Sequence, residues 1–137
     1  MSFERVNPES LGPPSGFTNG MLGPVNGRLL LVAGQDAARA GGEVETDDFV
    51  EQFDLALAKT LAVVTEAGGT AEDIGRMTIY VTDLDAYRAA RPDIGRSYRA
   101  RMGRHFPAMA LVEVSRLVDP RARVEIEATA VLESASS

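Results

Sequence analysis

Polar and apolar residues alternate strictly near the end of the chain, from Arg123 to Leu132 (RVEIEATAVL). A period of two predicts a β-strand that has one face in a core and the other in polar surroundings. Glu125 and Glu127 fall together on the polar face. The segment Ala108 to Ser115 has a similar pattern, so two consecutive strands are predicted, with a polar face that could carry chemistry.

Three earlier segments also have the pattern of strands. Phe17 to Val25 predicts a short first strand, and Arg28 to Ala33 is a continuous apolar run of the kind buried on both faces of a sheet. Between them, Asn26-Gly27 has the sequence of a two-residue hairpin turn. Arg76 to Thr82 alternates and is rich in β-branched residues, which predicts a third strand.

The clearest helix is predicted over about residues 48–67. Asp48 and Glu51 have the spacing of a capping box, and the apolar residues that follow recur at helical spacing. Gly68 has the position of a residue that ends a helix.

A second helix is predicted to start from a cap at Asp83 or Asp85 and to run to Gly103. Pro92 lies inside this pattern and lacks a backbone donor. Two interpretations stay open: the helix kinks at Pro92, or Pro92 opens a second segment after one turn.

The predicted order is β-β-α-β-α-β-β, with hairpins flanking two helices, which indicates an α+β fold with a mixed sheet and both helices on one face. The other face would expose apolar residues, as interfaces do, so a homo-oligomer with small-molecule clefts at the subunit junctions is expected. Residues 1–137 fit a single domain, in which 1–16 form an extended arm and 133–137 a frayed tail.

Composition narrows the classes of function. Hydrophobic residues make up 45% and charged residues 25%, which is typical of a globular protein. The chain has no apolar run of about 18 residues and no basic-then-apolar start, so neither a membrane span nor a secretory signal is expected, and the location is predicted to be cytoplasmic. With no cysteine and a single histidine, His105, we expect no disulfide, no metal site and no cofactor.

The net charge of −6 argues against nucleic acid as a partner. Arginines do cluster in one segment, but a solvated helix face explains such a cluster without a ligand. The clustered residues are Arg96, Arg99, Arg101 and Arg104.

A series of short motifs runs through nearly the whole chain. They are Gly16-Phe17, Ala33-Gly34-Gln35, Gly68 with Asp73-Ile74, Tyr80-Val81-Thr82-Asp83-Leu84, Phe106-Pro107-Ala108, Val112-Glu113-Val114, Arg116-Leu117 and Val124-Glu125-Ile126-Glu127-Ala128. In these motifs and their order the sequence resembles the Rid (YjgF) family, also described as L-PSP endoribonucleases, whose best-known members are enamine/imine deaminases.

The resemblance implies a chorismate-mutase-like subunit and a homotrimer with small-molecule clefts between subunits. Active members hydrolyse reactive intermediates such as 2-aminoacrylate and its imine to a 2-keto acid and ammonia. An arginine fork grips the substrate carboxylate, because its geometry matches the two oxygens. Backbone groups near the start of the penultimate strand complete the grip, and an acid on the last strand orders water or moves a proton.

Carried over to this chain, the resemblance makes Glu125 the acid and Ala110 part of the backbone grip. Met109 stands where the family motif Pro-Ala-Arg has its arginine. Methionine has no donor, and a charge-assisted hydrogen bond is worth about 1.5–3 kcal/mol, so the grip is lost unless another arginine supplies it. Arg116 and Arg101 are the candidates.

Two further positions change in the same direction, from polar to apolar. Phe17 replaces the tyrosine that lines the family cleft, and Ala33-Gly34 replaces Ser-Gly. A cleft of this kind is predicted to prefer a ligand that is larger or less charged than a small 2-imino acid. Each position also has a plainer interpretation: Glu125 as an exposed polar residue, and Met109 and Phe17 as core packing.

Three hypotheses about function follow. The first is a Rid-like enzyme that hydrolytically deaminates small enamines or imines, with a specificity other than the usual one for 2-aminoacrylate. The alternative is a trimer that binds a small metabolite in its apolar cleft without catalysis. An endoribonuclease ranks last, because the acidic charge and the single histidine argue against it.

Overall fold

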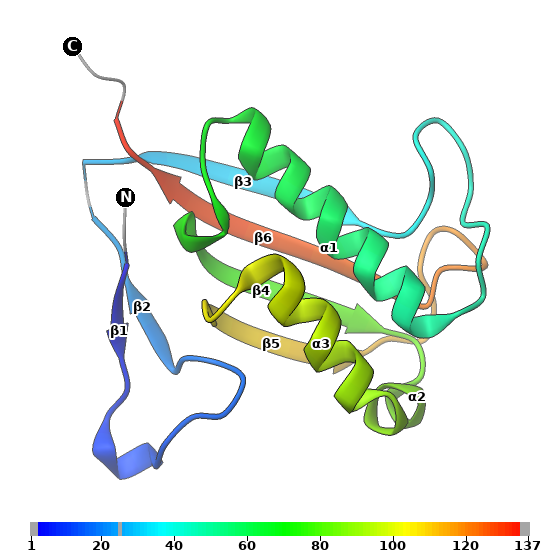
Figure 1. The fold of residues 1–137 in the computed structure, drawn as a ribbon, viewed down its shortest axis with the longest axis horizontal. Helices are drawn as coiled ribbons and strands as arrows, with labels where there is room; N and C mark the ends of the chain where they lie inside the picture. The colour runs from blue at the N-terminus through cyan, green and yellow to red at the C-terminus, as the bar shows by residue number, and fades with distance from the viewer. Residues whose placement is uncertain (1–2, 25, 135–137) are drawn as a thin grey trace.

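A mixed four-stranded sheet forms the centre of the computed structural model, which describes residues 3–24 and 26–134. Its strands lie in the order β3-β6-β4-β5 (Figure 1). β4 and β5 are parallel, and the other two pairs are antiparallel. The bounds are β3 Arg28–Gln35, β4 Ile74–Val81, β5 Ala108–Glu113 and β6 Val124–Leu132. The α+β class and the mixed sheet are therefore as expected from the sequence.

The pairing of the last two strands differs from the expected hairpin. β6 enters between β3 and β4, so β5 and β6 are not neighbours. β5 instead pairs with β4, from which it is separated by a helical crossover of the kind that parallel strands need. The segment 114–123 is long enough to return the chain past β4, which a two-residue turn could not do.

The prediction of a hairpin at Asn26-Gly27 is also wrong. β2 (Gly20–Leu22) pairs with β1 (Glu4–Val6) in a separate two-stranded sheet rather than with β3. Phe3, in the arm, anchors this small sheet. The Phe3 ring packs against Gly23 and Gly75, and a side chain at either glycine would collide with it. The arm thus contains β1 and the short helix η1 (Glu9–Leu11). Val25, at the end of the expected first strand, lies outside the described residues, as do 1–2 of the arm and 135–137 of the tail.

The first predicted helix is confirmed as α1, Phe49–Glu66. Asp48 caps it, accepting a hydrogen bond from the backbone N–H of Glu51 at 3.0 Å. The Glu51 carboxylate does not complete a capping box and instead accepts from the hydroxyl of Thr46 at 2.9 Å. Beyond the helix, Gly68 has a φ of 93°, which favours glycine.

The second helical region is two helices, α2 (Leu84–Ala89) and α3 (Arg91–Met102). Asp83 caps α2, accepting from the backbone N–H of Ala86 at 3.0 Å. Pro92 lies in the first turn of α3, where its missing N–H costs nothing. Of the two interpretations, Pro92 as the start of a second segment is therefore correct.

The helices α1 and α3 lie side by side over one face of the sheet (Figure 1). The core between them and the sheet is apolar and includes Phe53, Leu57, Met77 and Ile126. The short helix η2 (Ala71–Asp73) leads into β4. Within the described ranges, no helix has the length and apolar character needed to cross a membrane.

The opposite face of the sheet has no helical cover in Figure 1, and we call it the open face. Strand register places Leu31 opposite Thr129 and Val112 opposite Tyr80, on the same face as Glu125. Leu31 is 71% exposed and Val112 is 42% exposed. The expected exposed apolar face is therefore present in the single chain.

Candidate functional site

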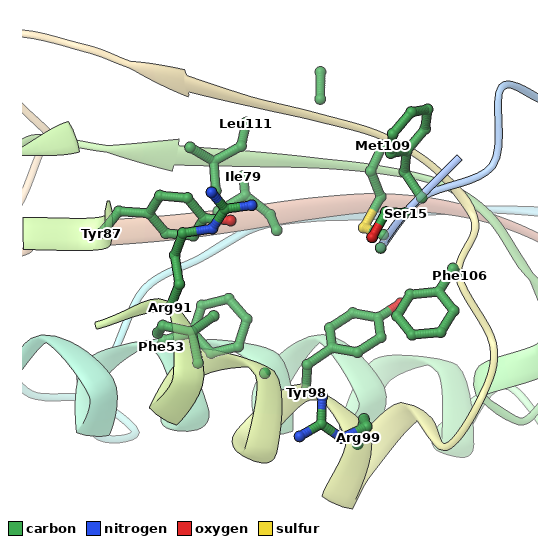
Figure 2. A pocket seen from close by; sticks show the side chains of 15 residues that line it. Ser15, Phe53, Ile79, Tyr87, Arg91, Tyr98, Arg99, Phe106, Met109 and Leu111 are labelled. Atoms are coloured by element: carbon green, nitrogen blue, oxygen red, sulfur yellow. The ribbon is translucent and has the colours of Figure 1, made fainter. Parts of the chain in front are cut away.

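A cavity of about 580 Å³ lies between α3 and the edge strand β5 (Figure 2). Its walls combine apolar side chains, among them Ile94 and Tyr98 on α3 and Leu111 on β5, with polar ones. Three of the predicted site residues line it, namely Phe17, Met109 and Ala110. A concave site of this size, with apolar walls and a few polar groups, is typical of small-molecule binding.

The wall formed by Phe17 and Met109 is fixed by backbone contacts between the arm and the start of β5. Thr18, next to Phe17, donates its hydroxyl to the carbonyl of Phe106 at 2.5 Å and its N–H to the carbonyl of Pro107 at 3.2 Å. Thr18 also forms a parallel bridge with Ala108. The family-like Phe-Pro-Ala segment therefore serves to dock the arm beside the cavity.

The same segment is held from the helix side by aromatic packing. Tyr98 stacks on Phe106 with ring centroids 5.1 Å apart, and its hydroxyl donates to the carbonyl of His105 at 2.6 Å. Burial raises the pKa of Tyr98. His105 is itself buried, with Nε2 2.7 Å from the carbonyl oxygen of Ile74. These contacts give His105 a structural role in the turn.

Glu125 lies on the open face and outside the cavity lining. Its side chain packs directly over Gly34: a Cβ at position 34 would lie 2.9 Å from the carboxyl carbon of Glu125. The β3–β6 register is interrupted between Val32 and Gln35, so Ala33 and Gly34 fall in an irregularity of the strand pair. The structure thus brings two predicted residues, Glu125 and Gly34, into contact, and a third, Ala33, lies next to Gly34 in the chain.

The environment of Glu125 disfavours its charged form. Burial raises the pKa of its carboxyl group, and the negative charges of Asp36 and Glu127 raise it further. No described residue donates a hydrogen bond to the Glu125 carboxylate. A half-buried carboxyl group with a raised pKa and free oxygen atoms suits proton transfer to a ligand or a water molecule.

The neighbouring carboxylates have other contacts. Tyr80 donates its hydroxyl to Oε1 of Glu127 at 2.6 Å, and this hydrogen bond is the main reason that the pKa of Tyr80 is raised. Glu113 lies on the other face of the sheet, opposite Val81, and accepts from the backbone N–H of Leu84 at 3.0 Å, so it holds the start of α2. Glu125 is therefore the acid on this face that remains available for chemistry.

Met109 and Glu125 point to opposite faces of the sheet. Met109 pairs with Met77, which faces the helices, whereas Glu125 pairs with Tyr80 on the open face. The residues predicted for one site thus fall into two groups in a single chain: one at the cavity and one on the open face.

Neither of the arginines suggested as a replacement for the family arginine lies in the cavity lining. Arg116 is exposed in the segment after β5. Arg101 is engaged by Asp54, with its Nε and Nη2 2.7 and 2.8 Å from the two carboxylate oxygens, and this contact lowers the pKa of Asp54. The arginines that do line the cavity are Arg91 and Arg99.

Arg91 was not identified from the sequence, although a signal for it exists. Once Pro92 is recognised as the start of a helix, Arg91 lies three residues before Ile94 and seven before Tyr98, which places all three on one helix face. The sequence places Arg99 on a solvated helix face, because a run of arginines is by itself a weak signal for a ligand.

Replacing Glu125 with glutamine is expected to raise the melting temperature by a few degrees at pH 7. The folded protein holds this carboxyl group with a raised pKa, so at neutral pH its ionised form costs stability that a neutral, isosteric amide does not. The gain should shrink as the pH falls through the folded-state pKa and vanish below the ordinary value of 4.5, where the group is protonated in both states. Calorimetry across this range measures it, with Glu43→Gln in an exposed loop as the control. A gain that persists at low pH, or appears equally in the control, would contradict the assignment.

An α+β subunit of this kind, with a mixed sheet covered by helices on one face, is the architecture that the resemblance to the Rid family implies. The chain belongs to the Endoribonuclease L-PSP family, whose sequence model matches residues 12–132. It is 38% identical over 106 residues to a RutC family protein of Haemophilus influenzae, covering 77% of this chain and 80% of that protein. Over 109 residues it is 31% identical to the putative reactive intermediate deaminase TdcF of Escherichia coli, covering 77% of this chain and 80% of that protein.

Solved structures give the same result for the fold. A protein of unknown function of the conserved Rid family, YyfB from Yersinia pestis, superposes with a TM-score of 0.84 at 32% identity, covering 96% of this chain and all of that one. The structure of E. coli TdcF with bound serine has a TM-score of 0.67 at 25% identity, covering 96% and 98%. The resemblance identified in the sequence is thereby confirmed.

Proposed function

We propose that this protein is a Rid-type hydrolase that converts small reactive enamines or imines to a carbonyl compound and ammonia. The observation that supports this most directly is Glu125: it occupies the position of the family acid, packs over Gly34 and has a raised pKa with free oxygens. The similarity to a putative reactive intermediate deaminase points to the same reaction class.

The proposed reaction needs only water and one acid–base group. The Glu125 carboxylate takes a proton from a water molecule as the water oxygen bonds to the imine carbon. The C=N π electrons move to nitrogen, which takes that proton from the protonated Glu125 to give a neutral carbinolamine. The carboxylate then takes the hydroxyl proton of the carbinolamine as the carbonyl forms, and it passes this proton to the departing nitrogen as the C–N bond breaks. The products are a carbonyl compound and ammonia, and the carboxylate is regenerated.

A site that uses both groups of predicted residues is proposed to form between subunits of a homotrimer. In one chain Met109 faces the helices and Glu125 faces away from them, so a substrate held at the cavity would need the acid of a neighbouring chain. The open face offers a reason to associate, because Leu29 and Leu31 are 65% and 71% exposed.

A trimer that binds a metabolite without turnover is the second candidate. It is favoured by Met109, which removes the family arginine from a cavity already lined by Phe17. Binding without catalysis would leave the reaction in solution unchanged. RNA cleavage remains the last of the alternatives, given the net charge of −6.

The proposal is tested by generating imines from leucine and from alanine with an amino-acid oxidase, in the presence of semicarbazide as a trap. We expect the protein to hydrolyse the imines before they are trapped, and to act more strongly on the leucine-derived imine, because the cavity is apolar. If the folded protein leaves trapping of both imines unchanged, the deaminase proposal fails. Ligand binding without any effect on trapping would instead support the second candidate.

A further inference from the structure

The cavity has a cationic end and an apolar end. Figure 2 shows Arg91 reaching from the start of α3 across to Tyr87 and Leu111, while Met109 and Phe106 lie at the other end. A ligand that fills this space therefore meets a guanidinium at one end and a thioether and an aromatic ring at the other.

Arg91 is one of two arginines that line the cavity, with Arg99. Two nearby arginines outside the lining are engaged: Arg88 lies 3.6 Å from a carboxylate oxygen of Asp85, and Arg96 pairs with Asp93. Arg91 makes no ion pair with any residue that the structure describes, and its Cζ lies over the ring of Tyr87, 6.0 Å from the centroid. That contact orients the guanidinium without neutralising it.

Arg99 also lines the cavity but is less suited to the role. Its Nη1 rests on its own helix: a Cβ placed on Gly95 would lie 3.1 Å from it. Arg91, in contrast, projects across the space between α3 and β5 (Figure 2).

We propose that Arg91 binds the carboxylate of the ligand in place of the arginine that Met109 has replaced, and that the ligand is a carboxylate with a bulky apolar group. Because the grip lies at the opposite end of the cavity from Met109, the apolar part of the ligand extends along the cavity toward Met109 and Phe106. The claim that such a carboxylate is the substrate rests on the proposed deaminase function. The claim that Arg91 binds such a carboxylate does not.

The size and lining of the cavity support this class of ligand. A volume of about 580 Å³ is far larger than a three-carbon acid needs, so such an acid would leave the apolar end filled with water. Each methylene group that the ligand adds at the apolar end should improve affinity about fourfold, from the free energy of burying a methylene.

The test is isothermal titration calorimetry of the full chain with three unreactive probes: 3-phenylpropanoate, its neutral amide 3-phenylpropanamide, and propanoate. We expect the phenyl acid to bind at least ten times more tightly than either of the others. Arg91→Gln should weaken binding of the phenyl acid about tenfold, the loss of one charge-assisted hydrogen bond, and leave binding of the amide unchanged. The control is Arg96→Gln, which removes the same charge from the same helix but outside the cavity lining, and should change the affinity less than twofold.

Equal affinities for the acid and the amide, or equal losses in Arg91→Gln and Arg96→Gln, would overturn the proposal. Both arginines are exposed, so neither variant should unfold the protein, and melting temperatures check this. Glu125→Gln separates the two proposals. If binding depends on Arg91 in both the wild type and Glu125→Gln but neither turns over an imine, the binding inference stands and the deaminase proposal falls.

Discussion

Glu125→Gln is expected to lower imine turnover about 10²- to 10⁴-fold, the usual contribution of a general acid–base group. Glutamine keeps the shape of the side chain over Gly34 and its fit on the open face. It cannot take a proton from water or return one to the leaving nitrogen. Substrate binding should change little, because the proposed carboxylate contact lies at Arg91, so the loss should appear in kcat and not in KM. Steady-state kinetics with the oxidase-generated imine measures both quantities.

The matched control is Glu127→Gln, one pleat further along the same strand and face. Its carboxylate accepts a hydrogen bond from Tyr80, and no proton transfer is assigned to it. We expect its kcat to stay within about threefold of the wild type, since the change removes only a neighbouring charge. A Glu125→Gln enzyme with nearly full kcat, or an equal loss in the control, would remove Glu125 from the mechanism.

Leu31→Asp is expected to convert the proposed trimer into monomers. Leu31 is 71% exposed on the open face of the single chain, so an aspartate there leaves the subunit fold intact. In an assembly that covers this face, the change removes about 1.5–3 kcal/mol of apolar burial and adds an unpaired carboxylate. The association constant should fall at least about 100-fold. Sedimentation velocity at micromolar concentration measures the oligomeric state.

The control for this experiment is Leu55→Asp. Leu55 is 37% exposed on α1, in the helical layer on the other side of the sheet. Its replacement by aspartate should leave the assembly unchanged. If Leu31→Asp remains the same size as the wild type, the open face is not the interface. If the wild type is itself a monomer, the proposals of a trimer and of a site between its subunits are both wrong.

Local patterns predicted the elements of this fold well, but not their pairing. The alternation in 123–132 and the cap at Asp48 depend on residues close in sequence, and both are present in the structure. The position of β6 between β3 and β4 depends on contacts between distant segments. One is the buried carboxamide of Gln52, which accepts from the backbone N–H of Arg123 at 2.7 Å and so fixes the chain at the start of β6. Nothing in the local sequence marks Gln52 for this role.

The candidate site was predicted only in part, and the reason is again that local sequence does not determine contacts between distant segments. Motifs identified Glu125 and Met109, because each lies in a segment whose neighbours are characteristic of the family. They did not reveal that the two point to opposite faces, since strand register depends on the partner strands. Arg91 lies outside those motifs, so its place in the cavity emerged only from the packing of α3 against β5.

The contact between Glu125 and Gly34 links two positions that are 91 residues apart in sequence. A side chain at 34 would meet the carboxyl end of Glu125 and displace it, so glycine at 34 allows the acid to keep its place over this strand. Among related proteins, loss of the acid at 125 should therefore release position 34 to vary. A chain with a larger residue at position 34 is expected to have lost the acid or to hold its carboxyl group in another place, and in either case to lack the arrangement proposed for this face.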